Sequence, residues 1–212
     1  MRRNSKFASA TQMLAFSEMT LFSNRGRWTL NEARCIEQFI GLRSDIALLS
    51  LASYFAELAE AVADEDSPNP ELLPLCLNAL FALGEGLKQP EYVKPAFELR
   101  LMAIAGFEPL MDYCARCEER EPRRAYLDAA GGTILCSGCS PLGGHELTLG
   151  ALHAARYIIG CDSKKLYSFK LGDVALRELS AAAENYVLAH LDRKFRTLDY
   201  YNAVCGPQRA RN

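Results

Sequence analysis

The sequence predicts a mainly α-helical protein with a small β part, in which a β-hairpin precedes a helical domain that carries an inserted zinc ribbon of four cysteines. Three observations support this fold class. Strand-forming residues flank a turn signal near the start, five later segments show helical periodicity, and two close cysteine pairs separate the third of these segments from the fourth. With 212 residues, half of them apolar, the chain can form one or two domains with buried cores.

The hairpin is predicted from residues 11–22 and 27–38, which are rich in strand-forming residues. Between them, Ser23-Asn24-Arg25-Gly26 is typical of a turn, because Asn and Gly tolerate positive φ. We expect about twelve residues in each arm, at the upper end of strand lengths. A two-stranded hairpin alone is marginal in water, so this one should pack on another element or belong to a larger sheet.

The helices follow from the spacing of apolar residues. From residue 44 to Val62 these residues recur every three or four positions, with Asp45 near the start, and residues 64–70 are typical of a loop. In the second helix, Pro74 can occupy the first turn, where a missing N–H is harmless. The later helices are predicted over residues 71–86, 95–105, 148–159 and 173–191, with Thr148 and Asp173 as N-terminal caps.

A metal site is predicted from the cysteine spacing C-x2-C-x18-C-x2-C, formed by Cys114, Cys117, Cys136 and Cys139. Two residues between sulfurs let one tight turn direct both thiolates at one ion, and this spacing is typical of a tetrahedral four-cysteine zinc site. The intervening chain predicts two short strands, at 126–128 and 133–135, around two glycines. The unit is therefore interpreted as a zinc ribbon.

The expected role of this zinc is structural. Four thiolates fill its four positions and leave none for water or substrate, so the metal would hold a local fold together. Two alternatives remain open from the sequence, namely a pair of disulfides and a thioredoxin-like redox motif. A redox CxxC stands at the start of a helix after a strand, whereas Cys114 follows a segment that is typical of a helix exit and a turn.

The other four cysteines, at positions 35, 76, 161 and 205, lie among apolar neighbours and are expected to be buried thiols. No apolar run reaches the roughly 18 residues that a membrane span requires. Arg2 and Arg3 are not followed by the apolar segment of a signal peptide. Unpaired cysteines without an export signal favour the cytoplasm.

Charge is unevenly distributed, although the net charge is only −2. Residues 1–34 carry six basic against two acidic side chains, and further basic residues lie between 193 and 211. A basic region at each end of a mildly acidic body is compatible with phosphate binding, and equally with solvated surface and a frayed tail.

Catalytic motifs are absent from the sequence: it contains no phosphate-binding loop, dinucleotide-binding glycine motif, nucleophile elbow or HExxH pair. His145 is expected in a loop just after the ribbon, where it could be a spare ligand, but four cysteines already fill the site. His153 and His190 are expected on helices, with no carboxylate or cysteine at ligand spacing. Residues 118–124 alternate acidic and basic side chains and are expected to form a solvated loop. We therefore predict no enzymatic activity.

Several segments resemble the RecO family of bacterial recombinational repair proteins. The most specific is FELRLMAIAGFEPLMDYCARC at 97–117, followed by GGTILCSGC at 131–139. Weaker likenesses are RRNSKF at 2–7, GRWTLNEARCIEQFIGLRSD at 26–45, LASYFAELAEAV at 51–62 and YVLAHLDRKFRTLDYY at 186–201, the last resembling a closing helix. The resemblance implies that residues 1–40 are the C-terminal portion of an OB-fold, and that 41–212 form a helical domain with the ribbon at about 112–140.

The resemblance also implies a function without catalysis. Family members bind and anneal single-stranded DNA and act with RecR and single-strand-binding protein so that RecA can load, in the cytoplasm and at the nucleoid. Phosphate contacts would come from Arg2, Arg3 and Lys6, with Arg25 and Arg27 on the hairpin as weaker candidates. Aromatic side chains of the hairpin could stack on bases or fill a barrel core.

One departure from the family concerns the start of the chain. Family members usually have roughly fifty more residues there, which hold the first strands of the five-stranded barrel. The expectation is therefore an incomplete OB-fold remnant, produced either by a start site placed too late or by a shortened form, and an unpaired hairpin edge would favour association. A protein-interaction module without DNA binding and a thiol redox enzyme remain alternatives.

Overall fold

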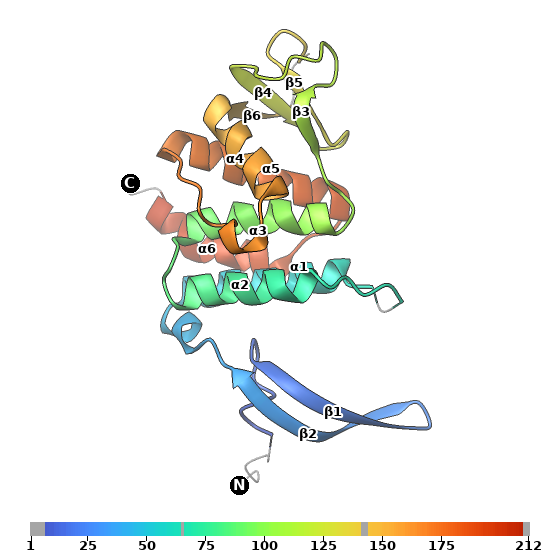
Figure 1. The fold of residues 1–212 in the computed structure, drawn as a ribbon. Helices are drawn as coiled ribbons and strands as arrows, with labels where there is room; N and C mark the ends of the chain where they lie inside the picture. Colours follow the sequence, from blue (N-terminus) through green and yellow to red (C-terminus); the bar gives the residue numbers. More distant parts are fainter. Residues whose placement is uncertain (1–6, 65, 141–143, 210–212) are drawn as a thin grey trace.

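The computed structural model describes residues 7–64, 66–140 and 144–209. Within this part of the chain, a β-hairpin is followed by six α-helices, and a small sheet is inserted between α3 and α4. Figure 1 shows the hairpin extending away from the helical body, with the inserted sheet on the opposite side of the helices. The predicted class, helical with a small β part, is confirmed; the assignment of the hairpin to an OB-fold, with a domain boundary near residue 40, stays a prediction.

The hairpin consists of β1 (Phe16–Asn24) and β2 (Arg27–Glu37), which pair antiparallel with Asn24 opposite Arg27. Arg25 and Gly26 have φ of 48° and 75°, and two positive values are what a type I′ turn requires. The hairpin and its turn were predicted correctly, but the first strand begins at Phe16 rather than at residue 11. Residues 7–14 fold back in turns instead, with the N–H of Thr11 donating to the carbonyl of Phe7 at 3.0 Å.

The two faces of the hairpin differ in polarity. Residues opposite one another on antiparallel strands project from the same face, so the pair Leu21–Leu30 shares a face with Met19 and Trp28. Charged residues, among them the ion pair Glu18–Arg34, lie on the other face. Trp28 is nevertheless 70% exposed. The hairpin thus has an apolar face that the described residues do not cover.

The helical body begins at α1 (Ile46–Val62), where the carboxylate of Asp45 accepts the N–H of Ala47 at 2.7 Å. This bond satisfies one of the free donors of the first turn, and Asp45 lies at the start of the helix, as predicted. The apolar stripe of α1 is buried, and Phe55 stacks on Phe97 with ring centroids 4.1 Å apart. The next helix, α2 (Leu72–Gly84), has Pro74 in its first turn, again as predicted.

The third helix, α3 (Pro90–Ile104), begins five residues before the predicted start. Pro90 and Pro95 both come before its apolar stripe, and the helix was predicted to begin at Pro95. Pro90 is the one in the first turn, where its missing N–H costs nothing, whereas Pro95 lies inside the helix. Packing of the surrounding apolar residues, including the fully buried Phe97, compensates for the missing backbone bond.

The last three helices are α4 (Leu149–Gly160), α5 (Asp173–Leu191) and α6 (Arg196–Arg209). Two expected caps differ: the side chain of Thr148 makes no capping bond, and Gly172 rather than Asp173 precedes α5. α5 ends at Leu191, as predicted, and the stretch 186–201 that resembles a closing helix is divided between α5 and α6, because Asp192 adopts φ of 43°. The chain then turns, and α6 packs along α1.

Lys94 on α3 is buried in an ionic cluster. Its ammonium lies 2.7 Å from Oε1 of Glu98 and 2.8 Å from Oε2 of Glu184, and Tyr54 donates to Glu98 at 2.9 Å. The side chains of Lys94 and Glu98 are 1% and 0% exposed. Burial raises the pKa of Glu98, and the adjacent Lys94 opposes this rise. The cluster holds α1, α3 and α5 together at one point.

Arg100, also on α3, closes the C-terminal end of α4. Its guanidinium donates to the carbonyls of Ile158, Ile159 and Cys161, the last at 2.8 Å. These carbonyls lie at the end of a helix, where backbone acceptors lack intrahelical partners and a cation is favoured. The segment FELRL at 97–101 therefore supplies a core ring, a buried carboxylate and a helix cap.

Candidate metal centre

The cysteines belong to a four-stranded sheet of β3 (Leu110–Cys114), β4 (Arg124–Asp128), β5 (Thr133–Cys136) and β6 (His145–Thr148), in the order β3-β5-β4-β6. The two central strands were predicted, whereas β3 and β6 were not. β3 lies parallel to β5, and a pairing between segments this far apart in the sequence cannot be predicted from a local pattern. His145, expected in a loop, is in β6.

The fold brings all four predicted ligands together. Cys114 ends β3 and Cys136 ends the adjacent β5, and each begins a tight turn that carries the second cysteine of its pair. The four Sγ atoms lie within 4.8 Å of one another, and those of Cys117 and Cys136 are 3.6 Å apart. Four sulfurs at about 2.3 Å from one ion would be about 3.8 Å apart. The spacing therefore fits a single tetrahedral ion.

Backbone N–H groups surround the sulfurs. The N–H of Cys136 donates to Sγ of Cys114 at 3.3 Å, and Cys139 donates its N–H to the carbonyl of Cys136 at 3.0 Å. The side chain of Arg116 donates to the carbonyl of Cys139 at 3.3 Å, which links the two turns. Cys114 and Cys136 are buried, while Cys117 is exposed. The turns are thus ordered by main-chain bonds that leave the sulfurs directed at a common point.

The proton affinities of these thiols differ. Burial opposes ionisation of Cys114, but hydrogen bonds from the N–H groups of Cys136, Arg116 and Cys117 outweigh it and lower its pKa to about 6. Hydrogen bonds with Cys117 and Cys136 raise the pKa of Cys139 to about 12. Thiolates this close repel one another, so their full ionisation requires a bound cation. A set of four sulfur donors suits soft metals such as zinc.

The redox alternative does not match this geometry. A reactive CxxC pair lies at the N-terminus of a helix, which lowers the thiol pKa, whereas here each pair follows a strand and is contained in a turn. The other four cysteines, at positions 35, 76, 161 and 205, are half-buried and lie outside the cluster, so the expectation that they are buried holds only in part. Burial raises the pKa of Cys76 to about 11.

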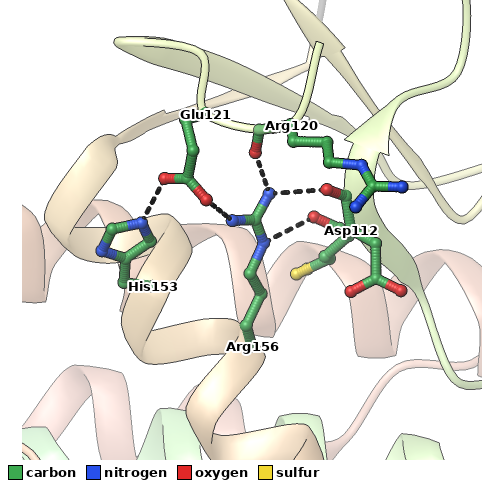
Figure 2. A network of polar contacts seen from close by, with 6 residues as sticks. Asp112, Arg120, Glu121, His153 and Arg156 are labelled. Atoms are coloured by element: carbon green, nitrogen blue, oxygen red, sulfur yellow. Dashed lines mark hydrogen bonds and ion pairs between the residues drawn. The ribbon is translucent and has the colours of Figure 1, made fainter. Parts of the chain in front are cut away.

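A second polar network joins the ribbon to α4 and was not foreseen (Figure 2). Nε2 of His153 lies 2.5 Å from one carboxylate oxygen of Glu121, and Arg156 donates to the other at 2.8 Å. The hydrogen bond with His153, then that with Arg156, lowers the pKa of Glu121. Glu121 is therefore tied to the helical body rather than simply solvated, and His153 does have a carboxylate partner. Since 32 residues separate that pair, spacing along the sequence could not reveal it.

The predicted DNA contacts lie at the other end of the molecule. Arg2, Arg3 and Lys6 fall outside the described residues. Arg25 and Arg27 are exposed in and beside the hairpin turn, together with two aromatic side chains, Phe22 and Trp28. This end of the hairpin therefore combines cationic and aromatic groups.

Comparison with known proteins identifies the family. The model of the C-terminal region of recombination protein O matches residues 43–199, from just before α1 into α6. The chain belongs to the RecO family. The match includes the ribbon and the FELRL segment, whereas the hairpin precedes it.

RecO-family relatives align over nearly the whole chain. DNA repair protein RecO of Acetivibrio thermocellus is 29% identical over 205 residues, which cover 96% of this chain and 82% of the relative. DNA repair protein RecO of Symbiobacterium thermophilum is 28% identical over 209 residues, with the same two shares. These alignments extend to the hairpin as well. No described helix is long and apolar enough to cross a membrane.

Proposed function

We propose that this protein acts in DNA repair and recombination as a mediator without enzymatic activity, which binds and anneals single-stranded DNA and helps to load RecA together with RecR and single-strand-binding protein. The family match over residues 43–199 carries this proposal. The relatives from Acetivibrio thermocellus and Symbiobacterium thermophilum are both named DNA repair proteins. A cytoplasmic location, at the nucleoid when the protein is bound to DNA, belongs to the same proposal.

The metal in this proposal is structural zinc, held by Cys114, Cys117, Cys136 and Cys139. When bound, it would supply charge neutralisation and a cross-link between the two cysteine turns, and no open position for substrate. The Sγ separations and the pKa of about 6 for Cys114 support this assignment. Replacing one ligand, as in Cys136→Ser, should lower stability and remove no chemical step.

Single-stranded DNA would bind at the end of the hairpin. Arg25 and Arg27 offer positive charge, and the exposed rings of Phe22 and Trp28 offer surfaces on which bases can stack. Glu18 and Glu32, which share the polar face farther from the turn, repel phosphates and favour a path along the turn. Arg2, Arg3 and Lys6 remain proposed contacts.

The test is fluorescence anisotropy with a labelled oligo(dT) at several salt concentrations. Each phosphate that is no longer neutralised in Arg25→Ala/Arg27→Ala should reduce the log–log salt slope by about 0.7. Trp28→Ala should weaken binding by about 1–3 kcal/mol if a base stacks on this ring. Arg34→Ala is the matched control, because Glu18 already pairs with this cation at 3.2 Å. Loss of salt dependence in Arg2→Ala/Arg3→Ala/Lys6→Ala would place the main contacts before the hairpin.

A protein-interaction module without DNA binding is the second candidate, favoured by α2. This helix contains no charged residue between Leu72 and Gly84, yet Leu73 and Phe81 on its surface are 54% and 49% exposed. Uncharged exposed helix faces are typical of protein–protein contacts. RecR binding that is abolished in Leu73→Glu/Phe81→Glu, in a protein that binds no oligo(dT), would favour this module over the mediator.

A further inference from the structure

Arg156 on α4 reaches into the ribbon through all three of its nitrogen atoms (Figure 2). Nε donates to the carbonyl of Met111 at 2.8 Å, and one terminal nitrogen donates to the carbonyls of Asp112 and Arg120 at 3.0 and 2.6 Å. The other terminal nitrogen donates to Glu121 at 2.8 Å. The side chain is only 19% exposed. One guanidinium thus holds three backbone carbonyls and a carboxylate of the ribbon.

These acceptors lie on both sides of the first cysteine pair. Asp112 is two residues before Cys114, and Arg120 is three residues after Cys117. The N–H of Cys114 also donates to the carbonyl of Glu119 at 2.8 Å, so the two flanks are in contact with each other. The loop from 112 to 121 is therefore closed on one side by its sulfurs and on the other by Arg156.

Glu121 fixes the position of this guanidinium. Its second oxygen contacts His153, which lies three residues before Arg156 on the same helix. Residues three apart on a helix lie side by side, so His153 and Arg156 both bind the carboxylate of Glu121. Arg100 separately caps the C-terminal end of α4, whereas the middle of α4 contacts the ribbon loop through Arg156 and His153.

We propose that Arg156 couples the four-cysteine site to the helical body, so that a metal bound in the ribbon orders α4 and Arg156 in turn raises the affinity for that metal. The inference rests on the zinc site of the proposed function. Loss of the metal loosens the cysteine turn, because metal binding and local folding are linked. The acceptors of Arg156 then move, and a largely buried cation is left without its partners. Coupling between two sites is reciprocal, so it can be measured from either end.

The metal end is tested by competition for Zn²⁺ with a chromogenic chelator. Arg156→Ala should weaken zinc affinity by about 10- to 100-fold, the range for residues that support metal ligands, and Arg156→Lys should have a smaller effect. Arg120→Ala is the matched control, since Arg156 uses only the backbone carbonyl of this residue. Its zinc affinity should stay within about twofold of that of the wild type, because no acceptor of the guanidinium is removed.

The helix end is tested by hydrogen exchange in residues 149–160 before and after zinc removal. Chelation should speed exchange there in the wild type and in Arg120→Ala. In Arg156→Ala, exchange should already be fast and chelation should add little, while unchanged exchange in α1 and α3 shows that the body remains folded. Arg156→Lys supplies the same comparison if the alanine variant unfolds.

Two outcomes would overturn the proposal, and they are distinguishable. A purified protein that binds no metal would refute the zinc site together with the coupling. The coupling alone would be refuted if Arg156→Ala and Arg120→Ala bound zinc equally well and if zinc removal left hydrogen exchange in α4 unchanged. The zinc site would then remain intact.

Discussion

The helical body and the hairpin use charged residues in opposite ways. In the body, Lys94 and Glu98 are paired inside the core, and Arg100 and Arg156 each bond to carbonyls of α4 or the ribbon. In the hairpin, the ion pair Glu18–Arg34 is 69% and 78% exposed and bonds to no other element that the structure describes. Charges in the body join one element to another, whereas charges on the hairpin remain available to solvent and to ligands.

The two regions differ in the same way in their apolar residues. Phe55 and Phe97 stack inside the body, whereas Phe22 and Trp28 are exposed near the hairpin turn. A region whose structure depends on a dense core tolerates few changes, and a region without one tolerates many. Substitutions in the two regions should therefore have very different effects on stability, and matched pairs of variants can measure this difference.

The largest contrast is expected between two phenylalanines. Phe97→Ala should lower the free energy of unfolding by about 3–5 kcal/mol, because it leaves a cavity beside Phe55. Phe22→Ala, at a ring that is 61% exposed, should change it by less than about 0.5 kcal/mol. Urea denaturation followed by circular dichroism measures both. Equal losses would mean that the hairpin is covered in solution.

Ion pairs should show the second contrast. Lys94→Met leaves the buried Glu98 without its cation and should cost about 3–5 kcal/mol at neutral pH. Arg34→Ala, in the exposed pair of the hairpin, should cost less than about 1 kcal/mol. Denaturation midpoints at a single pH are sufficient for this comparison.

The cost of Lys94→Met should also depend on pH. With its folded pKa raised above the ordinary 4.5, Glu98 binds more protons in the folded state, so folding is favoured at low pH and weakened as pH rises. Because Lys94 opposes this rise, its removal should raise the pKa of Glu98 further, so the variant should approach the wild type toward pH 4 and lose more stability than the wild type above it. The double variant Lys94→Met/Glu98→Leu should recover much of the stability, because it removes the unpaired charge. A cost independent of pH would show that packing, not charge, accounts for the effect.

Two glycines give the smallest contrast. A Cβ on Gly41, in the segment joining hairpin and body, would clash with the carbonyl oxygen of Gly84 at the end of α2. Gly41→Ala should therefore lower the free energy of unfolding by about 1–3 kcal/mol. Gly26 in the hairpin turn has open space around it, and Gly26→Ala should cost about 1 kcal/mol through its positive φ alone. Thermal unfolding of both variants measures the two losses of stability. A smaller loss in Gly41→Ala than in Gly26→Ala would mean that the segment at Gly41 is loosely packed.

Local patterns were sufficient for much of the fold. The hairpin turn, the start of α1 near Asp45, the stripe of α1 and the position of the ribbon between the third and fourth helices were all predicted from neighbouring residues. The start of α3 was wrong, because two prolines offered the same local cue and only packing selects between them. β3 was missed since its partner β5 lies about twenty residues away.

The same distinction between local patterns and distant contacts applies to the candidate site. The four cysteines could be selected as ligands from spacing, because a two-residue gap constrains how both sulfurs of a pair can point. Arg156 could not, since its acceptors lie 35 to 45 residues earlier in the chain and three of them are backbone carbonyls, which every residue carries. Lys94 and Glu98 likewise look like an ordinary helical surface pair until α1 and α5 cover them.

The sequence by itself selected the four cysteines that the fold brings together, the helical class of the body and its likeness to the RecO family, because each depends on the type and spacing of residues close together in the chain. Tertiary structure alone decided which charges are buried, how the ribbon is attached to α4 and that no other described segment covers the apolar face of the hairpin. These features depend on distant segments meeting in space, and the energy of a charge or an apolar side chain depends on what surrounds it.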